Sequence, residues 1–275
     1  MGSKTGIVNH INAIRCYLRK GQIKDPTGNS YGTTKPESPE ISETFISSST
    51  GMEFILIPPG EFHMGSSFQG EDGSDCESAV HKAMVKDYFY MGISPVTQKQ
   101  WKKIMGTNPS KFKDESRPVE MVSWEDIQEF IKRLNEVENT TRYRLPSEVE
   151  WEYACRAGTK TRYFFGDDES SLGEYAWYVK NAGRKTHPVG QKKPNYWGLY
   201  DMHGNVWELV LDKWNENYTD SVPCGSSSGD INNSAHISRG GSWYCDADYC
   251  HSDARFSREP QKRLPNLGFR LVREL

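Results

Sequence analysis

Apart from one possible short amphipathic helix at 7–18, helical periodicity lies in the middle of this chain, and that limits the folds it can adopt. Between Ser123 and Val137, apolar residues recur at steps of three and four, which predicts an amphipathic helix with Ser123 as its N-cap. A second helix is expected from Ser147, whose hydroxyl can form a capping box with Glu150, to the residue before Gly158. From Gly158 onward the sequence shows only short strand patterns and turns. We therefore expect an α+β protein rather than a helical bundle.

Short strands are expected on both sides of these helices. The stretch 52–58 (MEFILIP) is predicted as a strand, and the turn at 58–60 would lead it into a hairpin partner, EFHMGS. Further strands are predicted at 86–93 and 268–272, and a short helix should follow the cap residue Thr97. With 12% aromatic residues, 24 glycines and 14 prolines, we expect a loop-rich domain that large rings hold together.

The first 50 residues differ in composition from the remainder of the chain. The segment DPTGNSYGTTKPESPEISE is rich in Pro, Gly, Ser and Thr and can bury little apolar surface. We therefore predict an N-terminal extension and linker, largely disordered, over residues 1–50, and one domain over residues 51–275.

Charge and hydropathy exclude several classes of partner. The formal net charge is -3 and no long run of Lys or Arg is present, so we expect no nucleic-acid partner. The N-terminus lacks the apolar core of a signal peptide, and no stretch approaches the length of a membrane span. We expect a soluble, cytoplasmic protein with no membrane partner. The sequence favours no particular oligomeric state.

Two cysteines lie close together within RGGSWYCDADYC at 239–250. The chain has six cysteines, scattered rather than packed as in a secreted disulfide scaffold: Cys16, Cys76, Cys155, Cys224, Cys245 and Cys250. In a reducing compartment, neighbouring cysteines more often bind metal or take part in redox chemistry than form a structural disulfide. Buried structural thiols and an incidental disulfide are the alternatives.

Four separated motifs resemble those of the formylglycine-generating enzyme family, also called sulfatase-modifying factors. They occur in the family's order and at about its spacing: RYRLPSEVEWEYACRAG (142–158), YWGLYDMHGNVWELV (196–210), RGGSW (239–243) and GFRLV (268–272). The resemblance covers about residues 51–275. It implies a C-type-lectin-like α+β domain, loop-rich, with short strands and two main helices.

The resemblance also implies a copper oxidase. The enzymes carry one cysteine two residues and another seven residues after the aromatic that follows RGGS, here Trp243, and Cys245 and Cys250 match them. Two thiolates are soft ligands suited to Cu(I), with room for a third sulfur. Ser242 and Trp207 match positions that line the reaction pocket. The implied reaction is the copper- and O2-dependent oxidation of a cysteine to formylglycine in a client protein, a sulfatase with a Cys-x-Pro-x-Arg motif.

A structural calcium ion is implied as well. The resemblance assigns Asp201 and Glu208 as ligands through their side chains, and Gly204 and Val206 through their carbonyls. Carboxylate oxygens at either end of a tight glycine turn suit calcium, although a solvated acidic loop would have the same composition. A further family calcium site has Asn where this chain has Trp177, so we do not expect that second ion.

Other functions are possible on the same fold. The segment 251–267 departs from the family's Arg- and Ala-rich run, and only Arg258 fits that run by position. The alternative is a non-catalytic ligand-binding module, such as a retroelement-diversified variable protein, that uses the surface 244–263. A third possibility, an iron oxidase with histidine ligands, is disfavoured because the domain lacks an HxxxH-like pattern.

The remaining ionisable residues of these motifs are expected to be structural. His187 and His203 lie in turn-rich segments without metal-ligand spacing, so we expect satisfied turn histidines. Arg239, Arg255 and Arg270 are expected to form ion pairs beneath the aromatic surface.

Overall fold

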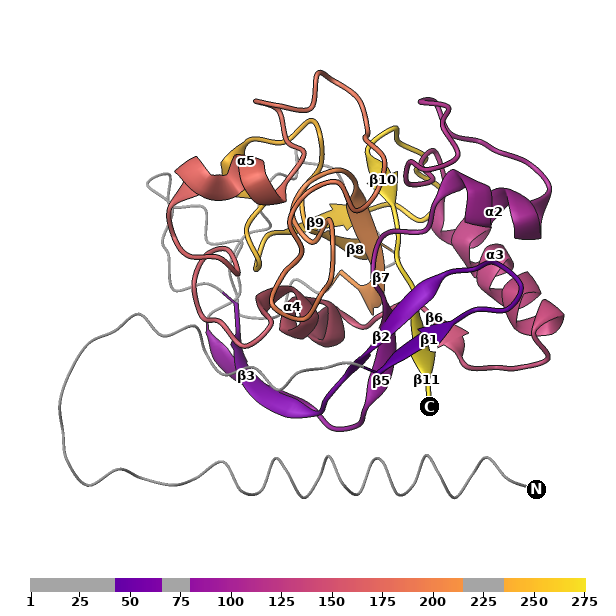
Figure 1. The fold of residues 1–275 in the computed structure, drawn as a ribbon, viewed down its shortest axis with the longest axis horizontal. Coiled ribbons are helices and arrows are strands. Elements are labelled where there is room, and N and C mark those ends of the chain that lie inside the picture. The colour runs from indigo at the N-terminus through magenta and orange to yellow at the C-terminus, as the bar shows by residue number, and fades with distance from the viewer. Residues whose placement is uncertain (1–42, 66–79, 215–234) are drawn as a thin grey trace, which may run out of the picture. The chain divides into compact units, whose positions relative to one another are not determined.

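The computed structural model describes residues 43–65, 80–214 and 235–275 (Figure 1). Residues 1–42, most of the predicted extension, lie outside this part. The sheet begins with β1 (Thr44–Ile46), ahead of position 51, where the sequence placed the start of the domain. No helix in the described ranges has the length and apolar character that a membrane crossing requires.

A five-stranded antiparallel sheet joins segments that are far apart in the sequence. Its order is β1, β2 (Glu53–Ile57), β5 (Phe89–Gly92), β11 (Val272–Glu274) and β6 (Tyr143–Arg144). The C-terminal strand β11 pairs with both β5 and β6. The strands predicted at 52–58 and 86–93 are confirmed as β2 and β5. The single strand predicted at 268–272 is wrong, because Gly268 ends β10 (Leu267–Gly268) of another sheet, residues 269–271 lie outside any strand, and β11 begins at Val272.

The predicted hairpin after position 58 is wrong. Strand β3 (Gly60–Met64) pairs with β4 (His81–Val85), and β2 pairs with β1 and β5 instead. Pro58 and Pro59 have fixed φ angles and no N–H to donate, so the chain leaves the sheet at this point. Gly60 is required there because a Cβ atom would lie 2.3 Å from the Tyr153 hydroxyl.

The three longer helices begin directly after the N-cap residues that the sequence predicted. Helix α3 (Trp124–Val137) begins at Ser123, whose hydroxyl accepts from the Asp126 N–H, and α4 (Glu148–Arg156) begins at Ser147 with the predicted Glu150 capping box. Helix α2 (Gln98–Met105) follows Thr97. The short elements are η1 (Glu169–Ser171), α5 (Leu172–Tyr175) and η2 (Ala247–Tyr249). The predicted stripe of α3 is buried from Ile127 to Leu134, whereas Trp124 at its start is half-buried and Val137 at its end is 63% exposed.

Helices α2 and α3 lie side by side at one end of the molecule (Figure 1). The rings of Trp101 and Phe130 stack with centroids 5.1 Å apart, and Phe269 meets both edge-on. Aromatic contacts of this kind add to the stability that burial alone supplies. The expectation of a domain held together by large rings is therefore confirmed.

A second sheet brings the motif residues together. Its order is β10 (Leu267–Gly268), β7 (Trp207–Lys213), β8 (His236–Arg239) and β9 (Arg255–Arg258). Trp207 begins β7 opposite Leu267, and Glu208 lies opposite Arg239 at the end of β8. The start of β7, the end of β8 and the start of β10 thus meet at one end of the sheet, from which the RGGSW loop departs.

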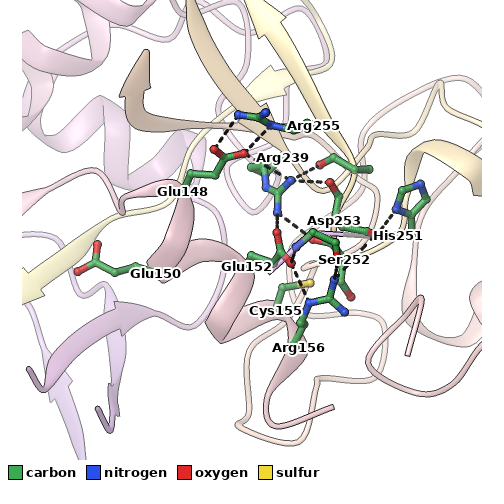
Figure 2. A network of polar contacts seen from close by, with 12 residues as sticks. Glu148, Glu150, Glu152, Cys155, Arg156, Arg239, His251, Ser252, Asp253 and Arg255 are labelled. Atoms are coloured by element: carbon green, nitrogen blue, oxygen red, sulfur yellow. Dashed lines mark hydrogen bonds and ion pairs between the residues drawn. The ribbon is translucent and has the colours of Figure 1, made fainter. Parts of the chain in front are cut away.

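A buried ion-pair network connects α4 to this sheet (Figure 2). Arg239 is 0% exposed; it pairs with Glu152 and donates to the carbonyls of Ser252, Asp253 and Ala254. Arg255 binds both oxygens of Glu148 at 2.9 Å. The expected pairing of these arginines is confirmed. Because residues 252–254 begin two positions after Cys250, the network also holds the chain on the C-terminal side of the cysteine pair.

Glu120 is buried beneath the loop at 108–113. One oxygen accepts the Phe112 N–H at 2.8 Å, and the other has no hydrogen-bond partner among the described residues. Burial raises the pKa of this carboxyl to about 7. The folded protein therefore binds the Glu120 proton more tightly than the unfolded chain, where the pKa is 4.5.

Stability should depend on pH through Glu120. Because the folded-state pKa is the higher one, the free energy of unfolding should rise as pH falls from 7 towards 4.5, and fall as pH rises through that window. Glu120→Gln keeps an acceptor for Phe112 and should flatten this dependence, by about 2 to 3 kcal/mol over the window. Urea unfolding at several pH values measures it. An unchanged profile in the variant would assign the dependence to another group.

Candidate functional site

Two glycines allow the RGGSW loop to approach Cys250. Gly240 and Gly241 both adopt positive φ angles, 91° and 73°. A Cβ atom on Gly241 would lie 2.6 Å from the Cys250 sulfur and 2.5 Å from the Tyr249 carbonyl oxygen. Only glycine fits such an approach. The loop therefore places Ser242 and Cys245 directly over the turn that carries Cys250.

Ser242 links the loop to the cysteine pair. Its Oγ lies 3.2 Å from the Cys245 sulfur, and its carbonyl accepts the Cys245 N–H at 3.0 Å. The Asn266 side chain donates to the same Oγ at 3.2 Å. Asn266 was missed in the sequence, where its only signal is its position just before GFRLV. The four predicted site residues Cys245, Cys250, Ser242 and Trp207 lie in one cluster.

The two thiols differ in exposure. Cys250 is fully buried against Tyr163 and Ala247, whereas Cys245 is half-buried and packs at the edge of the same cluster. Both are free thiols, so the structure contains no disulfide between them. The buried Cys250 sulfur can therefore bind a ligand from inside the fold, while the half-buried Cys245 sulfur can be reached from solvent.

Burial keeps both thiols protonated. It raises the pKa of Cys245, which hydrogen bonds from Ser242 and the Trp207 indole oppose. Burial raises the pKa of Cys250 well above its usual range, and the neighbouring Cys245 raises it further. Neither sulfur is therefore a thiolate at neutral pH, and binding of a soft metal ion would release protons.

The pair fits the Cu(I) ion that the resemblance implies. Two soft sulfur donors belong to one cluster and interact electrostatically, with a hydroxyl and an indole N–H beside Cys245. The described residues contain no group of three or more His, Cys, Asp or Glu side chains placed to hold a metal. A two-coordinate site is thus the arrangement that the pair supports, and it leaves a position for a third sulfur.

The predicted calcium loop is a tight turn that buries the Asp201 carboxylate, whose charge Arg270 offsets in part. Asp201 is buried; it accepts the Gly190 N–H at 2.8 Å and an Asn205 amide at 3.3 Å. Among the described residues, no cationic side chain lies within ion-pair distance of Asp201, and burial raises its pKa to about 6. Gly204 is required because a Cβ atom would meet the Trp177 carbonyl oxygen at 2.3 Å.

The Glu208 carboxylate already has side-chain partners at both of its oxygens. Arg270 donates to both of its oxygens, at 2.6 and 2.7 Å, and the Trp151 indole donates at 2.7 Å. Its charge is therefore neutralised by Arg270 without a metal, so of the two predicted carboxylate ligands only Asp201 lies outside an ion pair and the set fits calcium only in part. Calcium binding stays a prediction, in which Glu208 would offer only a remaining lone pair.

Chelation tests the calcium prediction. A cation bound by Asp201 would stabilise the folded state by mass action, so a chelator should lower the melting temperature, by about 5 °C if calcium had been present at a hundredfold excess over its Kd. Asp201→Asn should abolish this response, because the amide keeps the shape and loses the charge. Differential scanning calorimetry measures both. If the wild-type protein melts at the same temperature with calcium and with chelator, the predicted calcium site is contradicted.

Of the two motif histidines, His187 is the satisfied turn histidine that was expected, whereas for His203 this expectation is wrong, because its buried ring nitrogens lack a hydrogen-bond partner among the described residues. The His187 ring stacks on Trp177 with centroids 3.8 Å apart, and its Nε2 lies 2.7 Å from the Ala182 carbonyl oxygen. His203 is buried among aromatic rings and stacks on Phe164. Burial lowers the pKa of His203 to about 3. The His203 ring lies near the Cys250 backbone, but neither ring nitrogen forms a hydrogen bond of normal geometry. His203 is therefore an uncharged imidazole that packs among aromatic rings close to Cys250.

The surface proposed for a binding module is only partly available. Tyr244 and Tyr249 are 63% and 53% exposed on either side of the cysteine pair. Arg263, in contrast, binds both oxygens of Asp126 at 2.7 and 2.9 Å. Phe256 is half-buried beneath Arg258. The exposed aromatic surface therefore consists of the two tyrosines.

Comparisons with known proteins agree with this geometry. The family model for the sulfatase-modifying factor enzyme 1-like domain matches residues 41–275. The chain is 32% identical to the chaperone protein LppX of Paenibacillus barcinonensis, covering 80% of this chain and 89% of that protein. It is 30% identical to the formylglycine-generating enzyme of Mus musculus, covering 74% of this chain and 56% of that enzyme. The chain thus spans just over half the length of this enzyme.

Solved structures share the fold. Treponema denticola variable protein 1 superimposes with a TM-score of 0.71 at 29% identity, covering 85% of this chain and 99% of that one. PvdO from Pseudomonas aeruginosa superimposes with a TM-score of 0.70 at 28% identity, covering 85% and 98%. The α+β fold class is confirmed. On the match over residues 41–275, the chain belongs to the formylglycine-generating enzyme (sulfatase-modifying factor) family.

Proposed function

We propose that this protein binds Cu(I) at Cys245 and Cys250 and, with O2, oxidises a cysteine of a client polypeptide to formylglycine. The observation that carries the proposal is that two free thiols share one cluster at the RGGSW loop, which approaches the Cys250 sulfur at Gly241 and has Ser242 Oγ 3.2 Å from the Cys245 sulfur. The similarity to formylglycine-generating enzymes supports it. By the same similarity, the client would be a sulfatase with a Cys-x-Pro-x-Arg motif.

Each residue of the cluster would have a separate task. Cys250 anchors the metal from the buried side, and half-buried Cys245 completes a two-sulfur site that a substrate thiol can reach. Copper, when bound, supplies a soft centre for that thiol and the capacity to react with O2. Ser242, held by Asn266, keeps a hydroxyl beside the reacting sulfur, and buried Trp207 excludes water from it.

The test is metal stoichiometry together with product. The protein should bind one Cu(I) and convert a Cys-x-Pro-x-Arg peptide to the aldehyde, detected by mass spectrometry and by trapping with a hydrazide. We place the reaction in the cytoplasm, because the pair must stay reduced to bind Cu(I). Tight copper binding without any aldehyde would separate the metal site from this reaction.

A second candidate function is ligand binding without catalysis. It is favoured by the exposed Tyr244 and Tyr249, since tyrosines are adaptable contact residues, and by the likeness to Treponema denticola variable protein 1. In this case Tyr244→Ala should abolish capture of the protein ligand, while Cys245→Ser leaves that capture unchanged.

A further inference from the structure

Exposed apolar side chains surround the half-buried Cys245. Tyr244 comes directly before it in the sequence and is 63% exposed, and Val179 is 42% exposed. The Val179 N–H donates to the Cys245 carbonyl at 3.0 Å, so two segments far apart in the sequence meet at this cysteine. Tyr249, directly before Cys250, is 53% exposed. Single exposed apolar residues are ordinary, but several gathered at one place mark an interaction site.

The Tyr244 ring is held in place from below. It meets the ring of Trp243 edge-on, with centroids 5.4 Å apart. Trp243 is buried; its own ring meets Phe112 edge-on at 5.6 Å, and its Nε1 donates to the Pro265 carbonyl at 3.0 Å. Because the tyrosine packs on a fixed base, a contact with its exposed face costs little side-chain entropy.

The backbone around Cys245 is already hydrogen-bonded. The N–H groups of Tyr244 and Cys245 both bond to Ser242, at 3.4 and 3.0 Å. The N–H groups of Val179 and Tyr249 are bonded within the fold as well. A polypeptide therefore cannot add as a strand through these N–H groups, and recognition beside the thiol depends on side chains.

Charged side chains of these segments are mostly paired. Asp248 pairs with Arg162 at 2.6 Å, and Lys180 pairs with Glu169 at 3.4 Å. Asp246 is an exposed acidic residue of the same loop, so it disfavours an acidic neighbour of the substrate cysteine rather than attracting one. The surface thus favours apolar contact and opposes negative charge.

We propose that Tyr244 and Val179 bind an apolar side chain next to the substrate cysteine. The inference rests on the proposed function, which brings that cysteine to Cys245. Tyr244 is covalently joined to Cys245 and Val179 is hydrogen-bonded to it, so both side chains reach only the close neighbours of the substrate thiol. The substrate is then a polypeptide segment with an aliphatic or aromatic residue beside its cysteine. Tyr244 and Val179 are specificity-determining residues of this site.

Matched peptides test this without turnover. In the absence of O2, calorimetry measures the affinity of acetylated and amidated Gly-Leu-Cys-Gly and Gly-Asn-Cys-Gly, and of Gly-Cys-Leu-Gly and Gly-Cys-Asn-Gly, each with and without one equivalent of Cu(I). The wild-type protein should prefer one leucine peptide over its asparagine twin by about tenfold. The preference should persist in high salt and come with a more negative heat-capacity change, because it reflects buried apolar surface. The pair that shows it identifies the side of the cysteine that is bound.

Variants assign the preference to the two residues. Val179→Ser and Tyr244→Ser should each weaken it, and the double variant should remove it. The control Val137→Ser makes the same change at a valine that is 63% exposed at the end of α3, and should keep the preference. Equal affinity of the wild-type protein within both peptide pairs would overturn the inference, even if copper binds and the aldehyde forms. A leucine preference without copper binding would support this surface while the proposed oxidation fails.

Discussion

Cys245→Ser is expected to abolish Cu(I) binding and aldehyde formation together. A serine hydroxyl is a hard ligand that keeps its proton, so only the Cys250 sulfur would remain, and one thiolate does not hold Cu(I) in a two-coordinate site. We expect copper affinity to fall by at least about a hundredfold, as loss of a metal ligand exceeds the effect of altering its supporting partners. Competition with a chromophoric Cu(I) chelator measures the affinity, and mass spectrometry the aldehyde.

Cys155→Ser is the matched control. It makes the same change in the third free thiol of the described residues, which lies near the Met202 carbonyl rather than in the pair. This variant should lose some stability and keep its copper affinity, because the pair is intact. Unchanged copper affinity in Cys245→Ser would contradict the proposed oxidase and leave the exposed tyrosines as the better indication of function.

Local rules predicted the helices well because the signals are local. The hydroxyls of Ser123 and Ser147 accept hydrogen bonds three residues ahead, so a short window of sequence contains the whole interaction. Strand pairing is not local. The segments 53–57 and 60–64 look like a hairpin, yet they belong to different sheets, because β2 pairs with β5 and β3 pairs with β4, both further along the chain.

The site was predictable only through the resemblance, and only in outline. The motif spacing predicted Cys245 and Cys250 as site residues, but the charges around them are balanced by contacts between residues far apart in the sequence. Arg270 neutralises Glu208 from 62 positions away, which changes what the calcium loop can offer. Arg255 and Arg258 look alike in the sequence; one is paired with a carboxylate and the other stacks on rings. Such differences arise from tertiary packing, which no short motif encodes.

Glu152→Ala should destabilise the protein more than any surface substitution. Its carboxylate is 1% exposed and holds two arginines: Arg239, and Arg156 through Nε at 2.8 Å. Removing it leaves both guanidinium groups buried, with Glu148 3.6 Å from Arg239 and Asp253 3.9 Å from Arg156 as weaker partners. Breaking a buried pair in this way costs about 3 to 5 kcal/mol. Urea unfolding measures the loss.

Two further variants separate charge from packing. Glu152→Gln keeps an acceptor for the Gly65 N–H, which Glu152 binds at 2.9 Å, and should lose less stability than the alanine variant. Glu129→Ala removes an exposed partner of Arg133 and should change the stability little, because solvent screens this pair. Because Arg239 also holds the carbonyls of residues 252–254, Glu152→Ala should weaken Cu(I) binding at Cys250 as well. A loss in Glu152→Ala no larger than in Glu129→Ala would show that the network does not hold this part of the fold in place.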